Sequence, residues 1–219
     1  MNEFDGIRHV MLDFDGPVCH VFAGRPAPGV AQRLREFVGS IQTLPANLVT
    51  ETDPLGFVRA CYESPEIAAA VAAQLRAEEV AAAELAEPTP GSVATIEACK
   101  KTGRRITVVS NNSAEAVRSY LAIHGLESFV SFVSARPNDY TLMKPNPYLL
   151  YQAGEAVGTP MAESLLVGDS DTDILAAKAA GSAVIGYANK PGKFETFSSL
   201  RADLVVGDMR KVAEMLNGA

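Results

Sequence analysis

The fold is decided near the start of the chain, by the stretch Val10-Met11-Leu12-Asp13-Phe14-Asp15-Gly16-Pro17-Val18. Its apolar residues predict a buried strand, and side chains two positions apart on a strand point to the same face. Asp13 and Asp15 should therefore project together from the strand end, where Gly16 and Pro17 break the strand. Two carboxylates held so close repel each other, which indicates a bound cation or a division of chemical labour. For this motif alone, a solvated acidic strand end is the alternative.

The composition is that of a soluble protein with an acidic surface. The chain has 219 residues, of which 47% are hydrophobic and 21% charged, enough for one large domain or a core domain with a smaller insertion. Its formal charge of −7 argues against nucleic acid or an anionic membrane as the partner. An anionic substrate would then need a local cluster of donors, helped by a metal ion.

Cysteine use and the start of the sequence predict a cytoplasmic protein. Cys19, Cys61 and Cys99 include no CxxC pair, which is typical of a reducing compartment and not of a disulfide framework or structural zinc. The polar, acidic residues 1–5 do not resemble a signal peptide. The alanine-rich residues 67–86 carry too many charged side chains to span a membrane.

Apolar, β-branched runs recur along the chain and predict a parallel sheet, because buried parallel strands are apolar on both faces. The expected strands are His9–Phe14, Arg105–Val109, Phe129–Val133, Ser164–Val167, Ala183–Tyr187 and Asp203–Val206. The expected helices after residue 91 are Ser92–Thr102, Ala114–His124, Tyr148–Val157, Asp171–Ala180 and Met209–Leu216. This alternation predicts an α/β fold with a doubly wound, Rossmann-like parallel sheet.

Residues 20–88 interrupt the alternation, because they contain no convincing strand. The helices expected there are Gly29–Ile41, Leu55–Glu63 and Pro65–Glu87. We expect residues 20–88 to form a helical domain inserted into an α/β core made of residues 1–19 and 89–219. This insertion should cover the carboxyl ends of the strands, where open α/β sheets bind their ligands.

Polar residues follow four of the predicted strands and should meet at one edge of the sheet. They are Asp13 and Asp15 after the first strand, Ser110 and Asn111 after the second, Lys144 after the third, and Asp169 with Asp173 after the fourth. Taken singly, each has an ordinary explanation, such as a helix-capping serine, a surface lysine or an acidic helix N-terminus. Their coincidence at one edge favours a single site.

Four motifs in this order resemble those of the haloacid dehalogenase-like (HAD) hydrolases. Asp13–Val18 is similar to the family's first motif, DxDx[TV][LV], and Ser110 after a hydrophobic run is similar to the second. Lys144 resembles the third motif, and Gly168–Asp173 matches the GDSxxD form of the fourth. One motif alone would be weak, whereas four in order are a specific signal.

The resemblance covers about residues 8–190. Pro17 stands where Thr or Val is usual, and Asn146 where Asp often follows Lys-Pro, but neither position supplies an essential side chain. The insertion falls where subfamily I of this family carries its helical cap domain. The resemblance therefore implies a capped enzyme of the phosphatase branch, similar to phosphoglycolate phosphatases.

Such an enzyme would use Mg²⁺ to hydrolyse a small organic phosphate monoester through an aspartyl-phosphate. The resemblance makes Asp13 the nucleophile, while Asp15 protonates the leaving alcohol and then takes a proton from the hydrolytic water. Asp13, the backbone carbonyl of Asp15, and Asp169 would bind Mg²⁺, with Asp173 at the edge of the metal's water shell. The expected partner is a small phosphorylated acid or sugar, and the protein is expected to be a monomer or a homodimer.

The phosphoryl group would be held by residues of the second and third motifs. Ser110, the Asn111 backbone and Lys144 would contact its oxygens, with Gly16 in the same substrate-binding site. For the rest of the substrate, the insertion offers the arginines Arg25, Arg33, Arg35, Arg59 and Arg76. Arg25 is the preferred candidate because it follows the first motif closely.

Other functions share parts of this pattern. A haloacid dehalogenase has the same fold and nucleophile but needs no acid for its halide, so Asp15 argues against it. A phosphonatase needs a lysine in its cap, and residues 20–99 contain none. A response-regulator receiver has no helical insertion after its first strand. A catalytically silent phosphate-binding protein on the same fold, together with the dehalogenase, is the remaining alternative.

Overall fold

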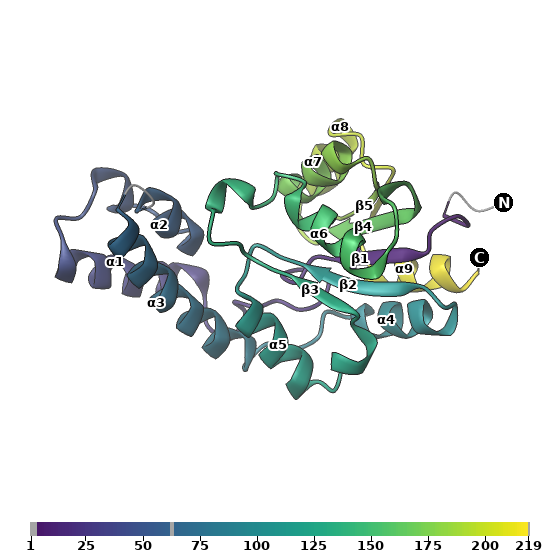
Figure 1. Cartoon of the computed structure of the whole chain (residues 1–219), viewed down its shortest axis with the longest axis horizontal. Coiled ribbons are helices and arrows are strands. Elements are labelled where there is room, and N and C mark those ends of the chain that lie inside the picture. The colour runs from purple at the N-terminus through teal and green to yellow at the C-terminus, as the bar shows by residue number, and fades with distance from the viewer. Residues whose placement is uncertain (1–3, 62–63, 219) are drawn as a thin grey trace.

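A computed structural model describes residues 4–61 and 64–218 of the chain (Figure 1). In this part of the chain, six strands form a parallel sheet in the order β3-β2-β1-β4-β5-β6. They are β1 (His9–Leu12), β2 (Arg105–Val109), β3 (Phe132–Ser134), β4 (Ser164–Gly168), β5 (Ala183–Tyr187) and β6 (Leu204–Val206). The chain runs from β1 outward to β3 and then crosses to β4 on the other side of β1. The predicted doubly wound parallel sheet is therefore confirmed.

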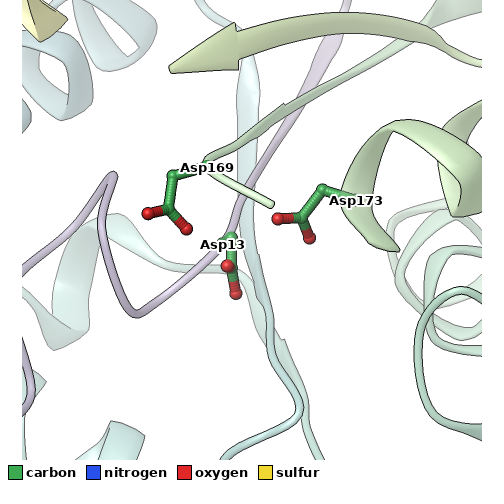
Figure 2. Close-up of side chains that lie close together, drawn as sticks. All are labelled: Asp13, Asp169 and Asp173. Atoms are coloured by element: carbon green, nitrogen blue, oxygen red, sulfur yellow. The ribbon is translucent and has the colours of Figure 1, made fainter. Parts of the chain in front are cut away.

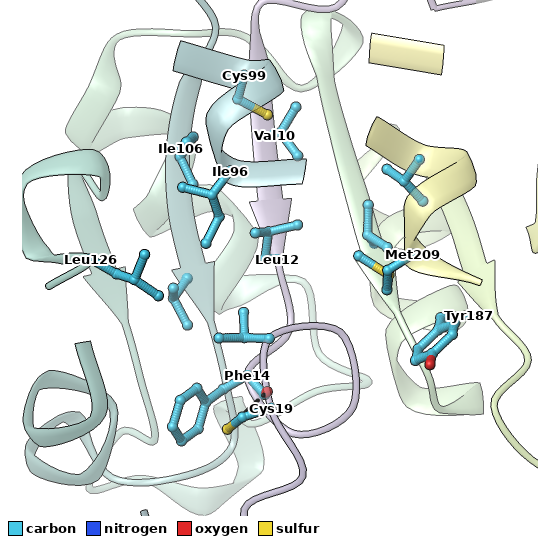
Figure 3. Close-up of a cluster of buried hydrophobic side chains, with 14 of the residues drawn as sticks. Val10, Leu12, Phe14, Cys19, Ile96, Cys99, Ile106, Leu126, Tyr187 and Met209 are labelled. Atoms are coloured by element: carbon cyan, nitrogen blue, oxygen red, sulfur yellow. Dashed lines mark hydrogen bonds between the residues drawn. The ribbon is translucent and has the colours of Figure 1, made fainter. Parts of the chain in front are cut away.

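Helices cover both faces of the sheet (Figure 1). One face carries α4 (Ser92–Lys101), α5 (Ala114–Ile123) and α9 (Met209–Asn217), and the other carries α6 (Tyr148–Val157), α7 (Asp171–Ala180) and α8 (Lys193–Ser199). Figure 3 shows the core on the first face, where Val10 and Leu12 of β1 pack with Ile96 of α4. Met11, the intervening residue, belongs to the core on the second face. A strand buried on both faces requires this alternation.

In its described residues, the insertion (residues 20–88) supplies three α-helices that lie beside the sheet (Figure 1). They are α1 (Ala27–Ile41), α2 (Pro54–Ala60) and α3 (Pro65–Ala83). A separate hydrophobic cluster, with Leu34, Phe57 and Leu75 among its members, holds them together. Ala82 and Ala83 at the end of α3 belong instead to the main core, with Phe14. Helix α3 thus contributes to both clusters. The domain boundaries at residues 19 and 89 therefore stay a prediction.

The two crossings between core and insertion lie next to each other. Cys19 and Pro88 pair in an isolated antiparallel bridge. The backbone N–H of Thr89 donates to the Val18 carbonyl at 3.0 Å, and the Thr89 hydroxyl donates to the Gly16 carbonyl at 2.5 Å. Both crossings are therefore bonded to the loop that carries the first motif.

Several predicted boundaries are wrong in detail. The third strand begins at Phe132 and not at Phe129, because residues 127–129 form a 3₁₀ turn closed by a hydrogen bond from the Phe129 amide to the Leu126 carbonyl. The first strand ends at Leu12 and not at Phe14. The helix expected to reach Glu87 ends at Ala83, where successive turns lead the chain back toward the core.

Two further helices differ from the expectations. The helix expected at Leu55–Glu63 spans Pro54–Ala60, and residues 62–63 of that prediction lie outside the described part of the chain. Helix α8 was not expected, because its seven residues are too few to show an amphipathic period. Its buried Phe197 packs in the second core and supplies the tertiary contact that stabilises it.

The cysteines are buried and free, as a chain without a disulfide framework requires. Burial, with a smaller contribution from the charge of Asp15, raises the pKa of the Cys19 thiol, so this residue is not an activated nucleophile. In the described residues, no helix combines the length and apolar character needed to cross a bilayer.

Candidate active site

A cleft of about 580 Å³ lies where the insertion meets the carboxyl edge of the sheet. One wall is formed by core residues that include Asp13, Asp15, Ser110, Asn111, Lys144 and Asp169. The opposite wall comes from the insertion and includes Phe22, Pro28, Asp53, Leu55, Arg59 and Glu79. The structure therefore brings together the polar residues that the sequence placed at four strand ends.

Three carboxylates at this edge form an acidic cluster. Asp13, Asp169 and Asp173 each offer an oxygen, and these oxygens lie within 4.8 Å of one another. Figure 2 shows Asp13 and Asp169 where their strands end, and Asp173 on the neighbouring helix. Parallel pairing explains the arrangement, because Leu12, the last residue of β1, lies level with Val167, and β4 ends one residue later at Gly168. Among the described residues this cluster does not include the Asp15 carboxylate, whose expected metal contact is through its backbone carbonyl.

Two glycines make room for these carboxylates. Gly16 has a φ of +110°, and a Cβ at this position would lie 2.4 Å from the Cγ of Asp169. A Cβ on Gly168 would lie 2.3 Å from the Cβ of Asp173. A side chain at either position would force the neighbouring aspartate to shift, since real Cβ atoms essentially never make contacts this short. Gly16 thus shapes the site by leaving space for Asp169.

Lys144 lies at the centre of the site and is only 2% exposed. Its Nζ contacts Asp13 Oδ1 at 2.8 Å and Asp173 Oδ1 at 2.5 Å, and donates to the Val109 carbonyl at 3.0 Å. Burial works to lower the pKa of Lys144, but the charges of Asp13 and Asp173 outweigh burial and raise it. The ammonium group is therefore charged at neutral pH.

The two aspartates of the first motif have different surroundings. Burial and the neighbouring charge of Asp173 raise the pKa of Asp13, and Lys144 opposes this shift. Burial and the charge of Asp169 raise the pKa of Asp15. The Asp15 carboxylate accepts a hydrogen bond from the Val21 amide at 3.0 Å, so the start of the insertion orients it. Asp13 is bonded to the core, and Asp15 is bonded to the insertion.

Residues 110–113 follow β2, and we call them the phosphate loop because the sequence analysis expects Ser110 and Asn111 to contact a phosphoryl group. The Ser110 hydroxyl donates to the side-chain oxygen Oδ1 of Asn112 at 3.0 Å and accepts from the backbone N–H of Asn112 at 3.1 Å. The Asn111 side chain pairs with the backbone of Lys144, accepting from its N–H at 3.0 Å and donating to its carbonyl at 3.2 Å. The second and third motifs are therefore joined by direct hydrogen bonds.

The comparison with known proteins agrees with this geometry. A family model described as haloacid dehalogenase-like hydrolase matches residues 7–181. The chain belongs to this family. The four motifs of this HAD-like hydrolase lie together in the structure. They supply the acidic cluster, Lys144 and the phosphate loop.

Individual relatives are similar over parts of the chain. Pyrophosphatase PpaX of Halalkalibacterium halodurans is 35% identical over 107 residues, which are 48% of this chain and 49% of the relative. The plasmid phosphoglycolate phosphatase of Cupriavidus necator is 31% identical over 134 residues, 59% of this chain and 56% of the relative. The chain thus spans about half the length of these curated relatives. The crystal structure of CbbY from Rhodobacter sphaeroides in complex with phosphate shares the fold, with a TM-score of 0.72, 18% identity and coverage of 94% and 96%.

Asp169 of this HAD-like hydrolase is contacted by two residues that the sequence analysis did not identify. Lys193 Nζ lies 2.6 Å from Asp169 Oδ2 and donates to the Asp169 carbonyl at 2.5 Å. The Asn189 amide donates to the same Oδ2 at 2.9 Å. Both residues come after β5, whose carboxyl end lies at the same edge of the sheet. The sequence analysis grouped polar residues that follow four of the strands, and the same search after β5 would have found these two.

Arg25 does not line the cleft of the HAD-like hydrolase, so the structure does not bring it to the expected substrate contact. Its Nε donates to Glu78 at 2.7 Å, and Glu78 also accepts two hydrogen bonds from Arg33. Burial acts to raise the pKa of Glu78, but the hydrogen bonds from Arg33 and Arg25 lower it to about 2. Among the described residues, Arg59 is the arginine in the cleft wall, 3.7 Å from Asp53.

Proposed function

We propose that this HAD-like hydrolase is a Mg²⁺-dependent phosphatase that hydrolyses a small organic phosphate monoester through an aspartyl-phosphate. The observation that carries the proposal is the contact of Asp13 with a buried, charged Lys144 inside an acidic cluster, at the floor of a cleft. The names of the relatives, a pyrophosphatase and a phosphoglycolate phosphatase, support chemistry on phosphate groups.

The side chains of the site suit a divalent cation. Asp13, Asp169 and the backbone carbonyl of Asp15 would hold Mg²⁺, which prefers hard oxygen ligands. Asp173 fits a place at the edge of the water shell, because Lys144 contacts its Oδ1 and Ser170 donates to its Oδ2. Three carboxylates, those of Asp13, Asp169 and Asp173, contact the ammonium groups of two lysines, Lys144 and Lys193, so an excess of negative charge remains that favours a cation. When bound, Mg²⁺ supplies the charge that lets an anionic nucleophile approach an anionic phosphate.

The protein groups divide the reaction between them. Asp13 attacks phosphorus with a carboxylate oxygen, and the bond from phosphorus to the leaving oxygen breaks. Asp15 gives its proton to that oxygen and later takes a proton from the water that hydrolyses the aspartyl-phosphate. Lys144 neutralises the charge on the phosphoryl oxygens, and the Ser110 hydroxyl and the backbone N–H of Asn111 donate hydrogen bonds to them.

The substrate we propose is a small phosphorylated acid or sugar. A cleft of about 580 Å³ accommodates a metabolite of that size, and Arg59 in its wall carries a positive charge for the non-reacting end. We propose further that the protein is cytoplasmic, that it binds neither nucleic acid nor membranes, and that it is a monomer or a homodimer.

The test is turnover of p-nitrophenyl phosphate with Mg²⁺ and after chelation with EDTA, followed by a panel of phosphorylated acids and sugars. We expect release of p-nitrophenol that requires the metal and disappears in Asp13→Asn. A folded protein that turns over no phosphate ester but binds inorganic phosphate would instead be the catalytically silent alternative. Halide release from a 2-haloacid would support the dehalogenase.

A further inference from the structure

A buried ion pair connects the insertion to the core beside the phosphate loop. Glu79 of α3 is 1% exposed, and its carboxylate meets the guanidinium of Arg136, a core residue that follows β3. The contact is bidentate, with Oε1 at 2.5 Å from Nη1 and Oε2 at 2.9 Å from Nη2. Bidentate pairs of this kind are the strongest charged hydrogen bonds that proteins make.

Both partners also bind the phosphate loop directly. Glu79 Oε2 accepts from the Ser113 amide at 3.0 Å, and Oε1 accepts from the Asn112 side chain at 3.4 Å. Arg136 donates from Nη1 to the Asn111 carbonyl at 3.2 Å, and from its backbone N–H to the Asn112 carbonyl at 3.0 Å. The pair thus fixes the loop's backbone at three consecutive residues that follow Ser110.

The neighbouring residue Glu78 shows what a purely structural ion pair looks like in this helix. Its partners, Arg25 and Arg33, both belong to the insertion, and none of its hydrogen bonds described above reaches the core. Glu79 differs because it lines the cleft, crosses to the core and contacts the loop that holds the phosphoryl group. Burying a carboxylate and a guanidinium carries a large desolvation cost, which good hydrogen-bond geometry must offset.

We propose that Glu79 is a positioning residue, which acts through Arg136 to hold the phosphate loop in the conformation that binds the phosphoryl group. In this role Glu79 acts on the loop and not on the phosphoryl group. Docking of α3 and the geometry of the phosphate loop are then one event, so catalysis depends on a residue of the insertion even for substrates with no group that reaches it. This inference rests on the proposed phosphatase function.

The test compares Glu79→Gln with the matched control Glu78→Gln. Both variants remove one charge from adjacent positions of the same helix. We measure kcat and KM for p-nitrophenyl phosphate, the inhibition constant of inorganic phosphate, and the melting temperature. For Glu79→Gln we expect a loss of about 10- to 100-fold in kcat/KM and a weaker inhibition by phosphate, because small misplacements of binding groups have effects of this size.

Glu78→Gln should lower the melting temperature while kcat/KM and phosphate inhibition stay within about threefold of the wild type. Arg136→Lys keeps the positive charge but loses the bidentate contact, so it should show a smaller loss of the same kind as Glu79→Gln. If Glu79→Gln does not fold, Arg136→Lys carries the test by itself.

The inference is overturned if folded Glu79→Gln, or Arg136→Lys in its place, matches Glu78→Gln in both kcat/KM and phosphate inhibition. A merely structural role would produce this result, since it changes the melting temperature and not the kinetics of the folded molecules. Failure of the proposed function shows elsewhere: the wild type itself would have no metal-dependent turnover. In that case the inference is withdrawn with it.

Discussion

At the scale of single residues, Asp13 is oriented by two contacts. Its Oδ1 accepts from the Phe14 amide at 2.8 Å and contacts Lys144 at 2.8 Å. Asp13→Asn should abolish turnover of p-nitrophenyl phosphate, because an amide is not a nucleophile and is a poorer metal ligand. Steady-state kinetics of the variant, with its fold checked by circular dichroism, measures this. A variant that keeps a tenth of the wild-type kcat would remove Asp13 from the nucleophile's role.

Asp15 differs from Asp13 in that its carboxylate is bonded to Val21, at the entrance to the insertion. Asp15→Asn should slow turnover by about 10²- to 10⁴-fold, the usual contribution of a general acid and base. The loss should be larger for an alkyl phosphate than for p-nitrophenyl phosphate, because p-nitrophenolate leaves without protonation. Equal losses on the two substrates would contradict the assignment.

Gly16 is a residue whose missing side chain matters to the site. Gly16→Ala combines a strained φ of +110° with a Cβ against Asp169, so the Asp169 carboxylate must move. We expect the Mg²⁺ concentration for half-maximal activity to rise, measured by titrating the metal. Gly103→Ala is the control, since Gly103 has a φ of +72° but no atom within 4 Å of the added Cβ. If both variants change the Mg²⁺ requirement equally, backbone strain explains the effect and the contact with Asp169 does not.

At the scale of secondary-structure elements, His9 connects three strands inside the sheet. It belongs to β1, and its ring nitrogens pair with Ser164 of β4 at 3.0 Å and Thr107 of β2 at 2.8 Å. Burial lowers the pKa of His9 from the ordinary value of 6.5 to about 4. The neutral ring is therefore the form that the folded protein stabilises.

The sign of the resulting pH effect follows from proton binding. Between about pH 6.5 and pH 4 the unfolded chain binds a proton at His9 that the folded protein does not. The free energy of unfolding should fall as the pH falls through this window, by up to about 3 kcal/mol from this group. Urea unfolding at pH 7 and pH 5 measures the fall, with His9→Gln as the control that does not titrate. Equal falls in both proteins would mean that His9 contributes nothing to it.

At the scale of the whole molecule, the insertion has two parts with different attachments. Helices α1 and α2 pack in the insertion's own hydrophobic cluster. The end of α3 is attached to the core instead: Ala82 and Ala83 pack in the main core, and Glu79 accepts a hydrogen bond from the phosphate loop. A deletion that reaches residue 86 would therefore remove part of the core along with the insertion. A cleaner variant replaces residues 25–74 with a Gly/Ser linker.

That variant should still hydrolyse p-nitrophenyl phosphate, because it keeps the acidic cluster, the phosphate loop and Glu79. Its discrimination among metabolites should collapse, since contacts to the non-reacting part of a substrate determine specificity. The measurement is the ratio of kcat/KM for the best metabolite to that for p-nitrophenyl phosphate. If the folded variant keeps the full-length ratio, the insertion does not determine specificity. Replacement of residues 25–86 should lower the rate on both substrates further, because it also removes Glu79.

The parallel sheet, and the polar residues that gather at its carboxyl edge, could be predicted from the sequence. Apolar runs reveal buried strands, and parallel strands all end at one edge, so Asp13, Ser110, Lys144 and Asp169 were grouped by a local rule. Short elements were harder, because a three-residue strand such as β3 and a seven-residue helix such as α8 show too little periodicity.

The pairing of charged side chains was decided by the tertiary structure alone. The sequence allows Arg25 to bind either an anionic substrate or a carboxylate of the protein. In the structure it donates to Glu78, which lies 53 positions away in the chain. Glu79 finds Arg136 across 57 positions, and Asp169 finds Lys193 across 24. A charged residue takes the partner that packing brings within about 3 Å, and packing depends on the whole chain. The sequence by itself therefore determined the fold and which polar residues gather at the carboxyl edge, whereas the folded chain decided which charges line the cleft and which pair with one another.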